Sequence, residues 1–174
     1  MTNPLLTSFD LPPFSAIQPE HVVPAVTEVL TDCRAMVEKV VAQGAPYTWD
    51  NLVQPLAETD DRLGRIFSPV SHLNSVKNSP ELRQAYEQTL PLLSEYSTWV
   101  GQHEGLYQAY RNLKEGENYA ALDLAQKKAV DNALRDFELS GIGLDKEKQK
   151  RYGEIAARLS ELGSAYSNNV LDAT

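Results

Sequence analysis

The sequence has a single cysteine, no cluster of basic residues and no long apolar run, and each absence excludes a class of protein. With Cys33 alone no intrachain disulfide can form, which favours a reducing compartment. The 24 Asp and Glu outnumber the 16 Lys and Arg, for a net charge of -8, so nucleic acid and anionic membranes would be repelled. No stretch approaches the roughly 20 apolar residues that span a bilayer, and the first residues lack the basic start of an export signal. We therefore expect a cytoplasmic protein that binds neither nucleic acid nor membrane.

What the sequence does contain is enough apolar material for one folded unit. Its 174 residues fit the usual length of a single domain, and 42% of them are hydrophobic. Apolar residues recur every three or four positions, and no alternating strand pattern bounded by turn residues is present. The fold class expected is all-α, a bundle of kinked and mostly antiparallel helices. The segments predicted to be helical are 19–44, 48–73, 79–101, 106–116, 124–141 and 145–174.

Start signals mark three of these helices. Thr48 and Asp145 are good N-cap residues, and Ser79-Pro80-Glu81 combines a capping hydroxyl, a proline suited to the first turn and a carboxylate. The first helix, which begins at Pro19, places Cys33 on its apolar side, so we expect a small buried side chain rather than a reactive thiol.

Prolines within the helical segments predict irregularity. Pro24 indicates a short turn before the main part of the first helix, and Pro69 a kink near residues 65–69. Pro91 is expected to interrupt the third helix, because an interior proline removes a backbone hydrogen bond and clashes with the preceding turn.

Residues 1–18 form a separate region, predicted to be an extended arm rather than a helix. Three prolines disfavour a helix there. The apolar residues expected to dock on the helical domain, residues 19–174, are Phe9, Leu11, Phe14 and Ile17.

The last helix has the clearest amphipathic pattern in the chain. Its apolar positions are Tyr152, Ile155, Leu159, Leu162, Tyr166 and Val170. We expect Tyr152 and Tyr166, like Tyr86 and Tyr96, to lie in the core or at its rim. Because this helix reaches Thr174 without a C-cap residue or a basic last turn, we interpret the chain as a fragment of a longer polypeptide.

His103-Glu104 imitates the start of a zinc-protease motif. A His-Glu-x-x-His helix needs a second histidine four residues on, and Tyr107 occupies that position. Gly105 also weakens the helix that would align the two ligands. The interpretation favoured is a solvated helix start, and no metal ligand is predicted.

The remaining polar groups also predict no catalytic residue. His21 is expected at the surface of a first helical turn. The polar run 68–75 around His72 either bonds to helix carbonyls freed by Pro69 or lines a groove, and no acid is spaced to orient His72 toward a serine. The acidic pairs Asp60-Asp61 and Glu115-Glu117 do not share a helix face, so we expect them to be solvated.

Four ordered segments carry a resemblance to a known family. They are Ile17–Ala25 (IQPEHVVPA), Phe67–Arg83 (FSPVSHLNSVKNSPELR), Phe137–Leu144 (FELSGIGL) and the run from Leu159 to Thr174. Together they resemble the N-terminal region of the thimet oligopeptidase family of zinc metallopeptidases, over essentially the whole chain. The resemblance implies a largely helical, two-lobed enzyme that cuts short peptides inside a deep channel, with this chain as part of one lobe.

The same resemblance implies that the zinc site lies outside this chain. The family's catalytic motif is a His-Glu-x-x-His helix with a later Glu ligand, and no position here matches it, so no catalytic or metal residue carries over. This segment would then be inactive alone and would form part of a channel wall that admits flexible peptides. Tyr107, Tyr110 and the His72 run are the only candidates for a channel-facing surface, and its substrate-binding residues stay unassigned.

A self-standing helical adaptor that binds a partner peptide or helix is the alternative. An adaptor should bury its apolar stripes, whereas part of a larger enzyme should expose the surface that meets the rest. Burial of the stripes therefore distinguishes the two hypotheses.

Overall fold

The computed structural model describes residues 2–173, which contain six α-helices and no β-strand. The all-α prediction is thus confirmed. The helices are α1 (Pro19–Gln43), α2 (Gln54–Val76), α3 (Pro80–Gly101), α4 (Glu104–Glu115), α5 (Leu124–Leu139) and α6 (Lys146–Ala173). Short turns of other helix types are η1 (Pro4–Leu6), η2 (Trp49–Val53) and η3 (Glu117–Tyr119).

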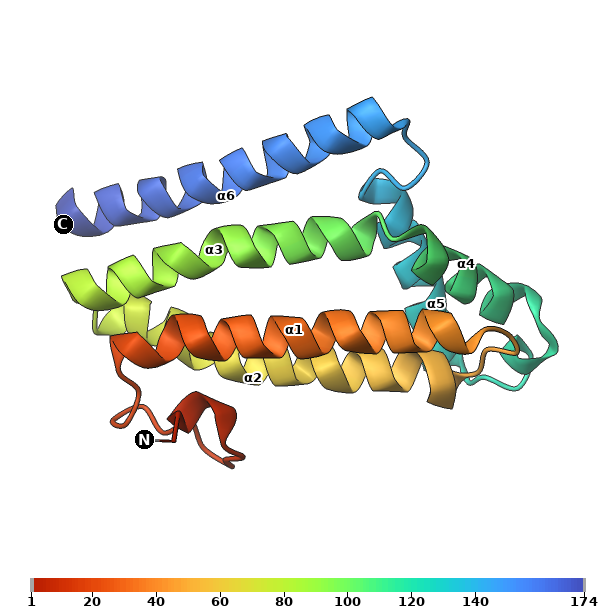
Figure 1. Cartoon of the computed structure of the whole chain (residues 1–174), viewed down its shortest axis with the longest axis horizontal. Coiled ribbons are helices and arrows are strands. Elements are labelled where there is room, and N and C mark those ends of the chain that lie inside the picture. The colour runs from red at the N-terminus through yellow and green to blue at the C-terminus, as the bar shows by residue number, and fades with distance from the viewer. Residues whose placement is uncertain (1, 174) are drawn as a thin grey trace.

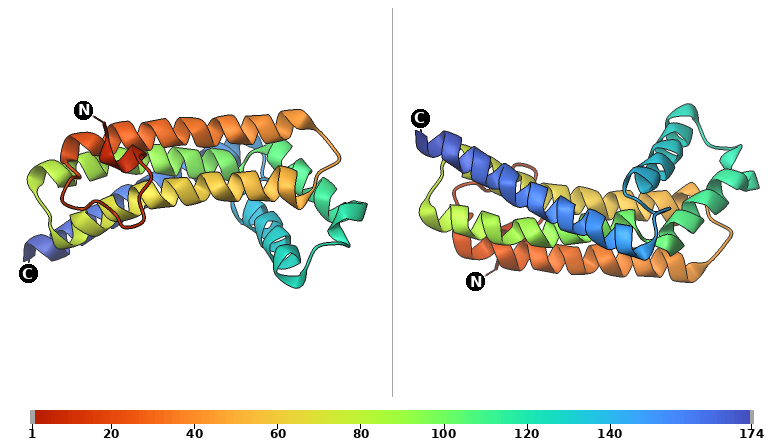
Figure 2. Two further views of the ribbon diagram at one scale, coloured as in Figure 1. Left: turned by 90° about the horizontal axis from the view of Figure 1, so that it is seen from below. Right: turned by 90° about the horizontal axis from the view of Figure 1, so that it is seen from above.

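The four long helices lie side by side along the long axis of the molecule (Figure 1). Helix α1 packs against both α2 and α3, and α3 packs in turn against α6, which is the outermost of the four. Helix α1 runs antiparallel to α2, and α3 runs antiparallel to α6. Because α2 also contacts α3, the first three of these helices form a bundle, with α6 against α3. Helices α4 and α5 cross one end of this bundle, and the N-terminal arm lies against α1 and α2 near the other end (Figure 2).

The predicted start signals act as N-caps. The Ser79 hydroxyl accepts a hydrogen bond from the Leu82 amide at 3.2 Å, and the Asp145 carboxylate accepts one from the Lys148 amide at 2.9 Å. Thr48 accepts from the Asn51 amide at 3.2 Å, but the turn it caps is the π-helical η2, which leads into α2. This π turn was not predicted. It lets Pro55 fall in the first turn of α2, where its missing N–H costs no helical hydrogen bond.

Two of the proline predictions are wrong. Helix α1 is continuous through Pro24, with no separate first turn, and α3 is continuous through Pro91. Helix α2 also continues through Pro69, and a kink there stays a prediction. The physical reason is burial: Val22, Ala25 and Val26 around Pro24 are fully buried, and such tertiary packing offsets one absent hydrogen bond.

The core consists of two apolar clusters that meet at Trp99 and Val100. One joins the arm, the first half of α1, the second half of α2 and α3. The other joins the end of α1, η2, α4 and α5. Cys33 is 1% exposed and donates to the Thr59 carbonyl at 3.7 Å, and burial raises the pKa of its thiol. The expectation of a buried cysteine is therefore confirmed.

The N-terminal arm docks through fewer residues than predicted. Ile17 is buried in the first cluster as expected, and so is Leu5 within η1, a short helical turn that the sequence did not reveal. Leu11, however, is 83% exposed, so its predicted docking is wrong. Its neighbours Pro12 and Pro13 fix the local backbone and leave the Leu11 side chain in solvent.

Two glycines give a matched pair of stability predictions. At Gly64, within α2, an added Cβ would meet no atom within 4 Å, whereas at Gly101 it would lie 2.6 Å from Ser140 Cβ. We expect Gly64→Ala to raise the free energy of unfolding by about 0.5–1 kcal/mol, since alanine favours a helix. Gly101→Ala should lower it by about 1–3 kcal/mol through overpacking. Urea denaturation of the two variants measures both, and equal effects would contradict the packing described at Gly101.

Candidate functional surfaces

The three histidines lie on separate elements and serve the local fold. His21 is in the first turn of α1, where its Nδ1 accepts from the Gln18 amide at 3.0 Å in a capping box, in line with the expected surface position. His72 is on α2, and His103 is the N-cap of α4. The His72 ring lies 5.6 Å from the Phe14 ring.

His103 begins a helix as expected, but it is not solvated. Its side chain is only 15% exposed, and its ring stands edge-on to Trp99 at 4.9 Å. Nδ1 accepts from the Leu106 amide at 3.1 Å, which leaves Nε2 to face Glu38 at 3.3 Å. Gly105 allows this close approach of α4 to α1, because an added Cβ at residue 105 would lie 2.7 Å from a Val41 methyl. Nδ1 of His103 thus caps α4, and Nε2 links this helix to α1.

A metal site is not formed by the part of the chain that the structure describes. Across residues 2–173 no three His, Cys, Asp or Glu side chains converge to hold an ion. The histidines are not arranged as metal ligands either. His103 uses Nδ1 to cap a helix, and the other two histidines lie on other elements. The same residues include no helix long and apolar enough to cross a membrane.

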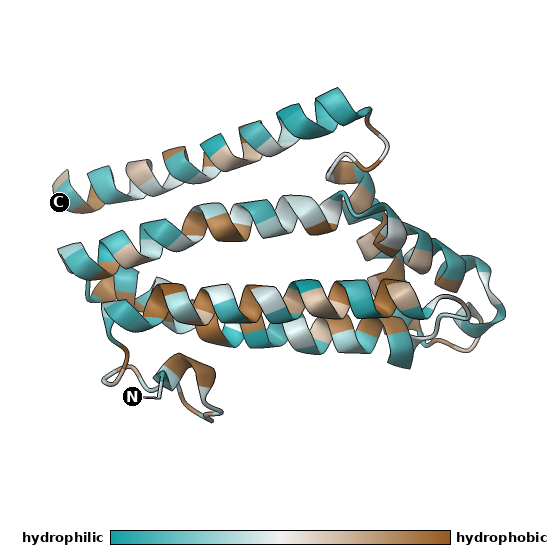
Figure 3. Ribbon diagram, in the orientation of Figure 1, coloured by the Kyte–Doolittle hydropathy of each residue, from teal (hydrophilic) through white to brown (hydrophobic). Residues whose placement is uncertain are grey.

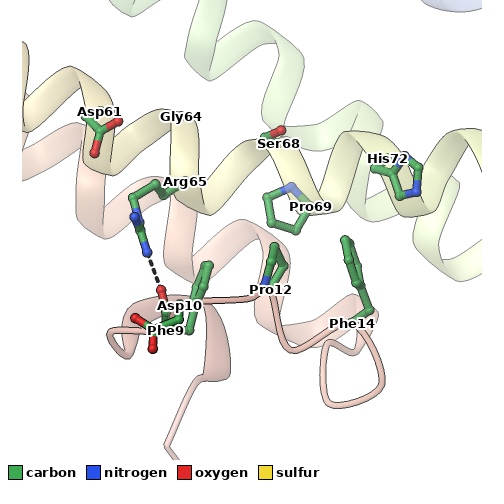
Figure 4. A pocket seen from close by; sticks show the side chains of 10 residues that line it. All are labelled: Phe9, Asp10, Pro12, Phe14, Asp61, Gly64, Arg65, Ser68, Pro69 and His72. Carbon is green, nitrogen blue, oxygen red and sulfur yellow. Dashed lines mark hydrogen bonds between the residues drawn. The ribbon is translucent and has the colours of Figure 1, made fainter.

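The N-terminal arm and α2 line an open pocket of about 650 Å³, here called the arm pocket (Figure 4). Its lining residues are Phe9, Asp10, Pro12, Phe14, Asp61, Gly64, Arg65, Ser68, Pro69 and His72. Within it the Arg65 guanidinium donates to the Phe9 carbonyl and lies 5.3 Å from the centre of the Phe9 ring. Figure 4 shows the rings of Pro12 and Phe14 directed from the arm toward α2.

The structure bears on the two hypotheses for the polar run around His72 unequally. Ser75 donates to the Ser71 carbonyl at 3.0 Å, but Pro69 does not free that carbonyl, so bonding to carbonyls freed by Pro69 stays a prediction. Ser68, Pro69 and His72 line the arm pocket, as the groove interpretation expects. Because Arg65 is already bound to the arm, we interpret the pocket chiefly as the seat of the arm on α2.

A second cavity, of about 520 Å³, lies among α1–α5 and contains Asp60. Its lining is mostly apolar, with Leu56, Leu63 and Phe137 among its residues. Although part of Asp60 reaches solvent, this partial burial raises the pKa of its carboxyl group above the usual value. Asp60 is nevertheless exposed, as the sequence suggested, and it also helps to raise the pKa of Tyr110, which burial brings to about 12.

This raised pKa gives a pH-dependent prediction. The folded state holds the Asp60 proton more tightly than the unfolded state, so the charged carboxylate costs stability that is recovered as the pH falls to the usual Asp value, about 4. We expect Asp60→Asn to be more stable than the unchanged chain at pH 7, and the advantage to shrink as the pH approaches 4. Urea denaturation at both values measures it, with Asp61→Asn as the control for loss of one charge. An advantage that is the same at both values would contradict the assignment.

Helix α6 contacts α3 through small and polar side chains. Gln149 is 7% exposed and donates to the carbonyls of Gly141 and Ile142 at 3.2 and 3.0 Å. Farther along, Arg83 forms a two-pronged ion pair with Asp172 at 2.8 and 2.9 Å. Between them an added Cβ at Gly153 would lie 3.3 Å from a Thr98 methyl, so the two helices approach closely there. The half-buried α6 residues between these ends include Gly153, Ala156, Ala157, Ser160, Ser164 and Asn168.

The large apolar side chains of α6 point away from α3, into solvent. We define the outer face of α6 as Ile155, Leu159, Leu162 and Tyr166, which are 45%, 63%, 47% and 72% exposed. The expectation that Tyr166 is a core or rim residue is therefore wrong, whereas Tyr96 is buried and Tyr86 and Tyr152 are half-buried. Figure 3 shows apolar residues interspersed with hydrophilic ones along this outermost helix. The clearest amphipathic pattern in the sequence thus faces away from the bundle.

The two tyrosines proposed for a channel-facing surface both pack against Phe137. Tyr110 is 8% exposed, and both Tyr107 and Tyr110 have their rings within 6 Å of the Phe137 ring, at 5.7 and 5.8 Å. Tyr110 belongs to the second apolar cluster and offers no free surface, whereas Tyr107 is half-buried against that cluster, so a channel-facing role for Tyr107 stays a prediction. The sequence showed the apolar stripe of α6 plainly, but it did not show that this stripe faces away from the bundle.

Comparison with known proteins matches residues 26–149 to a family model, that of the neurolysin/thimet oligopeptidase N-terminal domain. Oligopeptidase A of Salmonella typhimurium is 83% identical over 174 residues, which is the whole of this chain and 26% of that protein. Oligopeptidase A of Escherichia coli is also 83% identical over the same share of each chain. The organellar oligopeptidase A of Arabidopsis thaliana is 35% identical over 173 residues, 99% of this chain and 22% of that protein. The chain spans about a quarter of the length of the curated relatives it matches.

Proposed function

The chain belongs to the neurolysin/thimet oligopeptidase family, and we propose that it is the non-catalytic, helical N-terminal portion of a zinc-dependent oligopeptidase. The whole enzyme hydrolyses short peptides inside a channel in the cytoplasm. The observation that carries the proposal is the 83% identity to oligopeptidase A along the entire chain.

The structure supports this proposal over a self-standing adaptor. An adaptor would bury its strongest apolar stripe, since a soluble domain seldom leaves a contiguous apolar strip in water without a partner for it. Here Leu159 and Tyr166 on that stripe are 63% and 72% exposed. This arrangement is the one expected of a portion that meets more of its own polypeptide.

Zinc, on this proposal, is held by another part of the polypeptide. The residues described here do not fit it, because no group of three donor side chains converges among them. In enzymes of this kind a bound zinc ion activates water for attack on the peptide carbonyl. No step of that chemistry is assigned to a residue of this chain.

The role proposed for this chain is to form part of the channel wall. Four long helices pack into a bundle whose backbone hydrogen bonds are satisfied internally. Such a bundle resists the local opening that a folded substrate would require, so it would restrict entry to flexible peptides. The segment would thus set which substrates reach the zinc without touching the reaction.

The proposed channel-wall role is tested by giving the full-length enzyme the same cleavage sequence in two substrates. The sequence is supplied as a short quenched fluorescent peptide and, separately, within a loop of a stably folded protein. We expect hydrolysis of the peptide and none of the folded protein above background. Comparable rates on both substrates would contradict a size-restricting wall, and absence of hydrolysis of any short peptide would contradict the oligopeptidase assignment itself.

A further inference from the structure

We propose that the outer face of α6 is a docking surface for an amphipathic helix from the part of the same polypeptide that this chain does not include. The inference deepens the proposed function, because it rests on the chain being a portion of a longer peptidase. It concerns the region that joins the N-terminal bundle to the rest of the enzyme rather than any catalytic group.

The outer face has the geometry of a helix-packing seam. Ile155, Leu159, Leu162 and Tyr166 recur at intervals of four, three and four residues. This alternation is the spacing that places side chains along one seam when two helices pack at a small angle. All four side chains are nearly half exposed or more, so the seam has no second helix within residues 2–173.

Apolar side chains also extend this seam toward the N-terminal end of α6. Both Leu144 and Tyr152 lie against Gly141, since an added Cβ there would be 2.8 Å from Leu144 and 3.8 Å from Tyr152. Leu144 is 42% exposed, and Tyr152 is one turn before Ile155. The apolar strip therefore runs from the α5–α6 connection along most of α6.

Charged side chains border the outer face of α6, and Lys148, which pairs with Asp145 at 2.7 Å, lies on the same side of the helix one turn before Tyr152. Arg151 pairs with Glu154 at 3.0 Å, and Arg158 pairs with Glu161 at 2.9 Å, each on α6 itself. Because these charges are paired locally, the border is close to neutral. An apolar centre with a paired polar rim is the composition of a specific protein interface.

The length of the relatives identifies the occupant. Oligopeptidase A from two bacteria extends over about four times the length of this chain. The N-terminal domain model ends at residue 149, four residues into α6, so the outer face lies almost wholly outside that domain. A helix that leaves the N-terminal domain with its large apolar residues turned away from the bundle is placed to pack on what lies beyond that domain.

A second copy of this chain fits the surface less well. A stable dimer buries roughly 800 Å² on each partner, more than one row of side chains on a single helix supplies. Two copies would also bring together chains that each carry a net charge of -8. Docking within one polypeptide needs less area, because the two surfaces are already linked.

The test measures thiol protection in the full-length enzyme. Leu162→Cys is placed at the centre of the seam, and Glu154→Cys is the matched control, an exposed α6 position on the polar side. Each variant is treated with iodoacetamide, and labelling of its α6 peptide is followed by mass spectrometry, first native and then in urea. Cys33 is 1% exposed and reports in the same samples whether the bundle stays folded.

We expect the new thiol of Leu162→Cys to be labelled at least tenfold more slowly than that of Glu154→Cys in the native enzyme, and both at similar rates in urea. Equal native rates would overturn the proposal. Protection that disappears on dilution would also overturn it, by identifying a second copy as the occupant.

Peptide hydrolysis is measured on the same samples, so that loss of the proposed function is distinguished from loss of docking. An inactive enzyme in which the Leu162→Cys thiol is still protected supports the docking surface while contradicting the peptidase assignment. An active enzyme in which that thiol is labelled as fast as the control contradicts the docking surface alone.

Discussion

Replacing Leu113 with alanine is expected to lower the free energy of unfolding by about 3 kcal/mol, within the roughly 2–5 kcal/mol typical of buried Leu-to-Ala changes. Leu113 is 1% exposed and lies in the second apolar cluster with Val130 and Phe137. The lost side chain would leave a cavity between α4 and the rest of that cluster, because close-packed neighbours relax only in part. Urea denaturation followed by circular dichroism measures the change.

Leu124→Ala is the matched control for this prediction. Leu124 is 86% exposed at the start of α5, so the same chemical change there should alter stability by less than about 0.5 kcal/mol. If Leu113→Ala were as mild as Leu124→Ala, then α4 would not be packed into the core as described.

Gln149→Ala is expected to lower the free energy of unfolding by about 2 kcal/mol, since each buried polar group left without a partner costs about 1–3 kcal/mol. The Gln149 side-chain amide donates to the carbonyls of Gly141 and Ile142, and the Gln149 backbone carbonyl accepts from Gln102 at 3.3 Å. The alanine would remove this donor from both carbonyls. The Gly141 carbonyl still accepts from the Leu144 amide at 3.0 Å, so the carbonyl of Ile142 is the group left without its donor. Because these bonds hold the start of α6 to the α5–α6 turn, α6 should also open more often.

Hydrogen exchange provides the second measurement for Gln149→Ala. The amides of α6 should exchange faster, while those of α1 change little. Lys150→Ala, an exposed neighbour on the same helix, controls for the loss of a long side chain. Unchanged exchange in α6 would show that Gln149 does not anchor the helix.

The sequence predicted the helices well because their signals are local. Ser79 and Asp145 each accept a backbone hydrogen bond in the first turn of their helices, and a cap of this kind depends only on neighbouring residues. The glycine endings were equally local: Gly44 has a φ of 70° and Gly141 a φ of 82°, a region that side chains other than glycine rarely adopt.

The effect of prolines could not be judged locally. Pro24 and Pro91 cost each helix a hydrogen bond, and local rules therefore predicted breaks. Fully buried neighbours such as Val26 and Thr89 keep both helices continuous, and that burial depends on residues distant in the sequence.

The candidate surfaces were predicted only in part for a related reason. Periodicity showed that α6 has an apolar side, but not whether α3 or another partner would meet it. The small residues opposite that side, such as Gly153 and Ser160, allowed α6 to approach α3 instead. Tyr110 was misplaced because an aromatic residue near a helix start is compatible with a core or a surface until its neighbours, here Phe137, are known.

The central claim is that this chain shapes a zinc oligopeptidase without carrying its chemistry. Its most direct test is hydrolysis of a short quenched peptide by the 174-residue chain and by the full-length enzyme, each with zinc and each after chelation. We predict background rates from the chain in both conditions and zinc-dependent hydrolysis by the full-length enzyme. Zinc-dependent turnover by the chain alone, abolished by His103→Ala, would contradict the account.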